Sequence, residues 1–124
     1  DDNGTSGNTL SVDVVIDHHN GLDNIEVYYE SQDTIAGFQF DVEGAEVVSV
    51  AGGDATEYGF MMSNSETTVL GFSLTGSTIP AGSGLLLEMT ADVTGGVILY
   101  NIIVAGTNAE SLDFVFDDSS NEVV

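Results

Sequence analysis

The chain has 124 residues with 42% hydrophobic content, enough for one packed domain, and its 21 charged side chains are all Asp or Glu, because Lys and Arg are absent. The net charge of −21 excludes nucleic-acid binding, which depends on cationic contacts to phosphate, and disfavours anionic membrane surfaces. No apolar run approaches the ~20 residues of a membrane span, and without Lys, Arg or Cys the chain has no Schiff-base lysine, phosphate-clamping arginine, disulfide or thiolate metal site.

The first part of the chain passes from an acidic segment into strands. Residues 1–8 are predicted to form a flexible acidic leader or assembly arm, and residues 9–124 a single domain. Apolar and polar residues alternate over 10–16, which predicts a strand with one buried face. The segment 17–24, DHHNGLDN, is expected to be a turn-rich loop, and 25–30 alternates again as a second strand.

Strand patterns continue to the end of the chain. Clusters of Gly, Asn, Asp and Ser separate them at regular spacing, which is typical of an antiparallel β-sandwich or barrel. No segment keeps a helical period, so almost no helix is expected. The further strand candidates are 35–42, 45–51, 58–63, 67–74, 84–93, 97–104 and 112–117. The core is expected to contain Phe38, Phe40, Phe72, Leu87, Phe114 and Phe116.

Two stretches of this pattern resemble cohesin modules. IAGFQFDV (35–42) followed by AEVVSV (45–50) is similar to the family's opening, where a GFQFDL strand leads to an LEVVSV strand. TTVLGFSLTGSTIPAGSGLLLEMTADV (67–93) looks like the family's middle portion, with the IPAGSG turn as its best-defined feature. The resemblance covers roughly residues 9–117. It implies an all-β, about nine-stranded antiparallel jelly-roll sandwich, and the family's role of holding dockerin-bearing enzymes on scaffold proteins at the bacterial exterior.

The chain departs from the cohesin pattern at two points. Only Glu43-Gly44 separates Val42 from Ala45, where cohesins generally carry a longer turn. The absence of Lys and Arg also removes hydrogen-bond donors that a partner would normally find. Dockerin binding is therefore one option among several for this fold.

Catalysis is not expected. The two histidines, His18 and His19, are adjacent, and neighbouring side chains on an extended chain point in opposite directions, so both are predicted to be solvated loop residues. Among 21 carboxylates some pair lies at glycosidase-like spacing by chance, but a catalytic pair needs a cleft that raises the pKa of one partner. A small sandwich offers little concavity, so the chain is predicted not to be an enzyme.

Calcium is the candidate cofactor, because it takes oxygen ligands from carboxylates, amides and backbone carbonyls. The segment 17–24 supplies two carboxylates and two amides around a Gly turn, and 117–122 and 1–3 are comparable acidic clusters. The spacing is not that of an EF-hand, and the alternative is acidic turn residues that suit these backbone conformations and solubility. The candidate ligands are Asp17, Asn20, Asp23, Asn24, Asp117 and Asp118.

Three residues are the candidates for contact with a partner: Tyr28, Gln39 and Asp41, which alternation places outside. A carbohydrate-binding surface needs an aromatic platform or a polar groove, but the chain has no Trp. Tyr28 is the one aromatic placed outside, with Tyr58 and Tyr100 undecided. Polysaccharide is therefore a weaker candidate than a protein partner.

Assembly of the chain with its own copies is the remaining candidate. The outward side of 97–104, VILYNIIV, is apolar, and a neighbour could cover it or add a strand to a sheet edge that carries no protective Lys. The alternative is that 97–104 is a central strand buried on both faces.

The sequence thus predicts a non-catalytic extracellular adhesion or scaffolding module, a processed mature chain or excised domain of a secreted or cell-surface protein from a bacterium or archaeon. It binds a dockerin-like protein or forms homo-oligomers, with help from calcium. The alternatives are a subunit of a self-assembling filament or surface layer, built by strand addition, and a carbohydrate-binding module. Nucleic-acid binding and membrane insertion are not expected.

Overall fold

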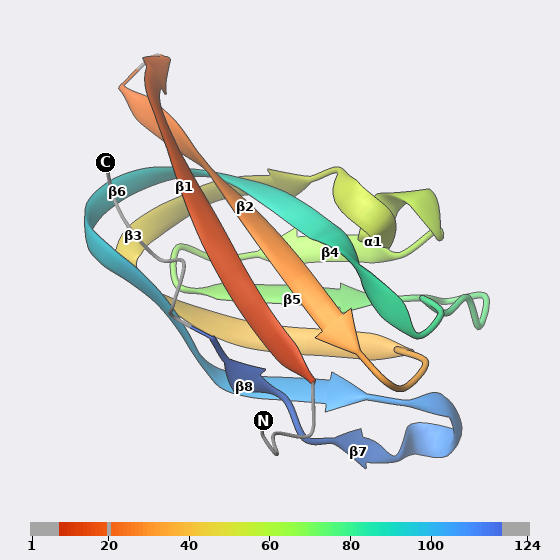
Figure 1. The fold of residues 1–124 in the computed structure, drawn as a ribbon. Helices are drawn as coiled ribbons and strands as arrows, with labels where there is room; N and C mark the ends of the chain where they lie inside the picture. The colour runs from red at the N-terminus through yellow and green to blue at the C-terminus, as the bar shows by residue number, and fades with distance from the viewer. Residues whose placement is uncertain (1–7, 20, 118–124) are drawn as a thin grey trace.

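Eight strands and one short helix make up the part of the chain that the computed structural model describes, residues 8–19 and 21–117 (Figure 1). Each segment predicted from the sequence to be a strand overlaps one of them. The elements are β1 (Thr9–His19), β2 (Leu22–Ser31), β3 (Gly37–Ala51), α1 (Gly53–Glu57), β4 (Met61–Asn64), β5 (Thr68–Phe72), β6 (Gly82–Ala105), a 3-10 turn (Thr107–Ala109), β7 (Ser111–Leu112) and β8 (Val115–Phe116).

The long strands β3 and β6 run through both layers of the fold. In the first layer β1 pairs with β8 and β2, β2 pairs with the first half of β6, and that half pairs with the second half of β3. In the second layer β4 pairs with β5, β5 with the first half of β3, and that half with the second half of β6. Figure 1 shows β1 and β2 crossing in front of β4 and β5, which is the arrangement of a β-sandwich.

Glycines bend β3 and β6 where the two strands pass together from one layer to the other. Gly44 has a φ of 91°, and a Cβ there would overlap the backbone carbonyl of Gly96. The pairing register with β6 shifts at Gly44, so the strand passes a bulge without losing its partner. The structure therefore joins the separate strands predicted within 35–51 and within 84–104 into one strand each.

The segment 17–24 is a hairpin, so the prediction of a loop is wrong. β1 continues to His19, which pairs with Leu22, and Gly21 takes a φ of 78° in the turn. A glycine in the left-handed conformation closes a tight turn, so strand pairing runs nearly to the tip. Polar residues at buried strand positions, such as Asp23, break the apolar and polar alternation, so alternation alone does not predict that the strands extend into 17–24.

One short helix joins β3 to β4. Gly52 and Gly53 take φ values of 74° and 68°, which turns the chain, and Ala55 packs into the core. The hydroxyl of Tyr29 donates a hydrogen bond of 2.6 Å to Asp54 Oδ2, which ties the helix to β2. Burial together with this bond raises the pKa of Tyr29 well above its usual range. No helix in the described residues is long or apolar enough to cross a membrane.

The core lies between the two layers. The ring of Phe38 stacks with those of Phe40 and Phe60, with centroids 6.2 Å and 6.0 Å apart. The prediction of a buried core residue is confirmed for Phe38, Phe40, Leu87 and Phe114. It is wrong for Phe72, which is half-buried on the outer side, and is confirmed in part for Phe116, which is half-buried and packs against the core. Phe72 points outward at the end of β5, and Phe116 lies on β8 at the edge of the first layer.

Candidate functional site

A shallow depression lies on the outer surface of the second layer, where β5, β3 and β6 run side by side; we call this surface the β5–β3–β6 face. The register places Gly37 of β3 between Phe72 of β5 and Ala105 of β6. Paired positions point their side chains to the same side of a sheet, so the missing side chain of Gly37 leaves a gap between its two neighbours. The depression has a volume of about 210 Å³ and is lined by residues of all three strands.

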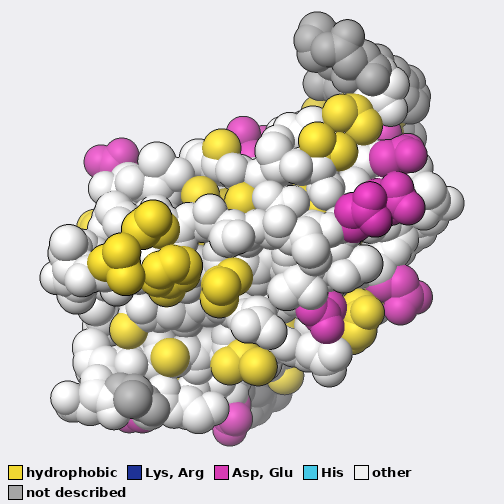
Figure 2. Space-filling model, turned by 180° about the vertical axis from the view of Figure 1, so that it is seen from behind, with side chains coloured by type: hydrophobic (Ala, Val, Ile, Leu, Met, Phe, Trp, Pro, Cys, Tyr) yellow, Lys and Arg dark blue, Asp and Glu magenta, His cyan; other side chains and the backbone are white. Residues whose placement is uncertain are grey.

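Apolar side chains border the depression on the next row of the face. Gln39 lies between Leu70 and Ile103, and these two apolar residues are 36% and 57% exposed. Figure 2 looks at this side of the molecule and shows hydrophobic side chains gathered toward one end of the face. A group of exposed apolar side chains on one surface is a common mark of a binding site.

Two neighbouring glycines, Gly37 and Gly71, are glycines for different reasons. A Cβ at Gly71 would overlap the ring of Phe38, so the packing of the core requires glycine there. A Cβ at Gly37 would meet nothing closer than the carbonyl oxygen of Gly71 at 3.5 Å, which is an ordinary contact, and Gly37 has no positive φ. Neither backbone conformation nor packing demands glycine at position 37, and its effect is to keep the depression open.

A fixed carboxylate, that of Asp41, lies beyond Gln39 on the same strand. The hydroxyl of Thr68 donates a hydrogen bond of 2.6 Å to one carboxylate oxygen, and the amide of Asn101 donates one of 3.0 Å to the other. These two bonds, with the one from Thr68 contributing more, hold the pKa of Asp41 below its ordinary value. Asn101 reaches the carboxylate from a bulge in β6, where its φ is 50°. The face therefore presents an ionised carboxylate in a set orientation.

The three candidates for partner contact do not share one surface. Gln39 and Asp41 lie together on the β5–β3–β6 face, as the alternation of β3 predicts. Tyr28 lies on the outer side of the first layer, across the sandwich from them. Its hydroxyl donates a hydrogen bond of 2.8 Å to Glu26 Oε1, and this bond raises the pKa of Tyr28 above its usual value.

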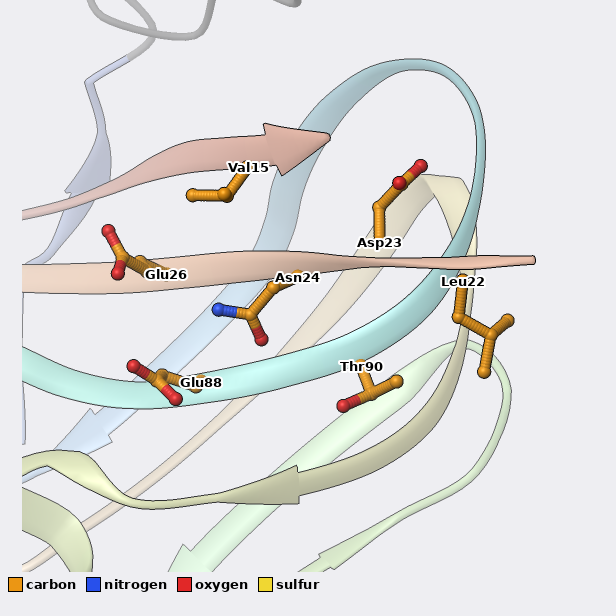
Figure 3. Close-up of a pocket in the computed structure, with 7 residues that line it drawn as sticks. All are labelled: Val15, Leu22, Asp23, Asn24, Glu26, Glu88 and Thr90. Carbon is orange, nitrogen blue, oxygen red and sulfur yellow. The ribbon is translucent and has the colours of Figure 1, made fainter. Parts of the chain in front are cut away.

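A second depression, of about 290 Å³, lies on the first layer beside the β1–β2 hairpin (Figure 3). Acidic side chains make up most of its polar lining, because Asp23 and Glu26 of β2 border it and Glu26 pairs with Glu88 of β6. Asp23 is buried and Asn24 half-buried, and Figure 3 shows these two side chains leaving β2 on different sides. The strand geometry thus separates two of the candidate calcium ligands.

The other candidate calcium ligands are not gathered by the described structure. The side chain of Asp17 and the whole of Asn20 and Asp118 lie outside the described residues, and Asp117 is exposed after β8, where its backbone N–H bonds to the carbonyl of Leu10 at 2.8 Å. Within the described part of the chain, no group of three or more acidic or His side chains is placed to hold a metal ion. Calcium binding stays a prediction.

Reasoning from the sequence missed most of the residues that shape the β5–β3–β6 face. The apolar outward side of 97–104 indicated Ile103, but Phe72 was assigned to the core, and nothing in the sequence marked Gly37. Asn101 was missed because its role depends on a bulge. Only the pairing of β5, β3 and β6 brings these residues together.

The fold matches solved structures of cohesin modules. A non-cellulosomal cohesin from the hyperthermophilic archaeon Archaeoglobus fulgidus is 15% identical, with a TM-score of 0.63 over 90% of this chain and 86% of its own. The sixth cohesin of scaffoldin B from Acetivibrio cellulolyticus, solved in complex with a mutant Cel5 dockerin, is 15% identical, with a TM-score of 0.67 over 90% and 95%. A cohesin from Clostridium thermocellum, solved in the Coh-OlpA–Doc918 complex, is 14% identical, with a TM-score of 0.62 over 88% and 94%.

The chain therefore has the cohesin-type jelly-roll β-sandwich that the sequence resemblance implies. No protein-family model matches it, and no curated protein matches its sequence. The likeness to the solved cohesins shows the fold, and what this chain binds has to be argued from its own surface.

Proposed function

We propose that the chain is a non-catalytic protein-binding module that docks one partner on the β5–β3–β6 face. The observation that carries the proposal is the depression at Gly37, which neither packing nor backbone conformation requires and which exposed apolar side chains surround. Apolar area around a concave centre supplies the burial that protein association needs. Two of the solved cohesins were crystallised with dockerins, which supports a protein as the partner.

The proposal includes an extracellular scaffolding role. The acidic, cysteine-free composition supports a location outside the cell, since salt or divalent cations there can screen the charge. The pKa of Asp41 on this face is lowered, whereas a carboxyl group that acts as a general acid needs a raised pKa, so Asp41 is not suited to that role.

Strand addition between copies is the weaker candidate. Among the described residues β4 is an edge strand, and its Met61 is 52% exposed, so a further strand could pair there. A second copy also has a net charge of −21, however, and the repulsion between the two copies opposes assembly unless cations screen it. A protein of different charge is the better partner.

The test is a comparison of three baits immobilised at equal density and exposed to proteins secreted by the source organism. The wild-type chain and Gly95→Val should retain the same proteins, because a Cβ at Gly95 meets nothing within 4 Å. Gly37→Leu fills the depression without a clash at Cβ and should lose the partner while keeping its melting temperature. Retention of the same proteins by all three baits, or by none, would contradict docking at this face.

A further inference from the structure

We infer that the partner of the β5–β3–β6 face is a basic protein segment that places an apolar anchor in the depression at Gly37 and a Lys or Arg against Asp41. The inference rests on the proposed function and specifies the chemistry of the partner. Three facts carry it: the charge of the chain, the order of residues along β3, and the fixation of Asp41.

The charge of the chain limits which partner can dock. All 21 charged side chains are acidic, so no internal cation can pair with a carboxylate that docking removes from water. Desolvating an unpaired carboxylate is strongly unfavourable, because the ion loses its hydration and gains no opposite charge. A neutral or acidic partner would therefore lose affinity at every carboxylate it covers, and a basic partner gains both affinity and association rate.

The residues of β3 place the carboxylates of the face at one end, which we call the acidic end, where exposed Tyr100 and Ile98 of β6 lie opposite Asp41 and Glu43. The end without carboxylates is the apolar end. Gly37 lies at the apolar end, while Asp41 and Glu43 follow on the same outer side of the strand. Figure 2 shows acidic side chains toward the end of this view opposite to the apolar group. Gly37 and Asp41 are four residues apart, which is roughly 13 Å of strand. One partner segment can cover both ends.

Asp41 is prepared to accept a cation. Thr68 and Asn101 hold one carboxylate oxygen each, and both donors are neutral, so the negative charge remains uncompensated. Each oxygen keeps acceptor capacity for a further donor. A carboxylate fixed in this way loses little side-chain entropy when a Lys or Arg binds, and charge-assisted hydrogen bonds are the stronger kind.

A pair of isomeric helical peptides tests the inference. Both have the same composition, with a Leu anchor, one Lys, and otherwise neutral residues, so their long-range attraction to the chain is equal. In the first the Lys lies seven residues from the anchor on the same helix side, about 10.5 Å away by the helix rise, and the Lys side chain spans the rest. In the second the Lys lies on the opposite side. Binding is followed by the backbone amide shifts of the labelled chain.

The first peptide should bind at least tenfold more tightly than the second, with shifts at Gln39, Leu70 and Ile103. Asp41→Asn keeps an oxygen for the Thr68 hydroxyl and should abolish this tenfold preference. Gly37→Leu should weaken both peptides, and Gly95→Val should change neither. Melting temperatures of the variants check that each one folds, and Glu43→Gln removes one charge from the same end of the face while leaving Asp41 in place.

Three outcomes would overturn the inference. Equal affinity of the two peptides for the wild-type chain would show that a cation at Asp41 does not contribute to binding. Docking at the apolar end would still be supported if Gly37→Leu weakens the binding of both peptides. A preference that survives Asp41→Asn assigns the cation to another carboxylate. If neither peptide shifts the amide signals of the β5–β3–β6 face, the claim that a basic segment binds there is wrong. The comparison of the three baits tests separately whether a protein docks on the face.

Discussion

Asp41 is the single residue whose chemistry the fold sets most directly. Its carboxylate accepts hydrogen bonds from Thr68 and Asn101, two residues far from it in the sequence, and stays ionised at the acidic end of the β5–β3–β6 face. Its depressed pKa means that the stabilisation from these bonds is present above the ordinary Asp pKa and is lost as the pH falls through the folded-state value. The same ionised carboxylate of Asp41 thus serves the proposed binding of a cation and makes the stability of the fold depend on pH in the acidic range.

Thr68→Val should raise the pKa of Asp41 toward its ordinary value of 3.8, because it removes the donor that lowers the pKa most. Asn101→Gly is the matched variant, since glycine keeps the positive φ of the bulge and loses only the second donor, so a smaller rise is expected. Carboxyl carbon chemical shifts followed against pH measure both values. An unchanged titration of Asp41 in the two variants would show that the bonds do not form in solution.

At the scale of elements, the sheet of β5, β3 and β6 has a side packed against the core and an outer side, and one glycine belongs to each: Gly71 to the packed side and Gly37 to the outer side. Gly71→Ala should destabilise the chain by roughly 1–3 kcal/mol, because the added methyl overlaps the Phe38 ring and overpacks the core. Gly37→Ala should be neutral or stabilise by up to ~1 kcal/mol, since alanine suits a strand better than glycine does.

Urea unfolding of the two alanine variants checks this pair. Equal destabilisation at both positions would mean that Gly37 is needed for folding, and the argument that it keeps the depression open would fail. A stable Gly71→Ala would instead mean that Phe38 packs elsewhere than under Gly71.

The strands themselves were predictable, but their partners were not. Alternation with a period of two placed a predicted segment on each strand and Gln39 and Asp41 outside, but it missed the ends of β1 and β2 within 17–24. It could not show that a glycine bulge at Gly44 keeps β3 continuous through both layers. Phe72 was assigned to the core because an aromatic in a strand pattern is normally buried, and only its pairing opposite Gly37 shows that it borders a depression.

For the molecule as a whole, charge opposes the folded state. The expected radius of gyration is ~14 Å by the scaling for compact domains, and the Debye length at physiological salt is ~8 Å, so many of the 21 carboxylates repel one another. The row of Asp13, Glu26 and Glu88 across β1, β2 and β6 places like charges directly opposite each other, which is unfavourable.

The melting temperature should therefore rise when sodium chloride is added to a low-salt buffer that contains a chelator. At matched ionic strength, calcium should raise it further if the 17–24 segment binds the ion as the sequence predicts. Equal increases of the melting temperature with sodium and calcium would support charge repulsion in the folded state and contradict a specific calcium site. A melting temperature that does not respond to either salt would contradict the electrostatic account.

The central claim is that the chain docks its partner on the β5–β3–β6 face, and hydrogen exchange tests it most directly. Amide exchange is measured for the chain alone and with the partner that the wild-type bait retains. Docking at this face predicts added protection in β5, in 37–43 of β3 and in 98–105 of β6, with exchange in β1 and β2 unchanged. Added protection confined to β1, β2 or β8 would contradict the claim.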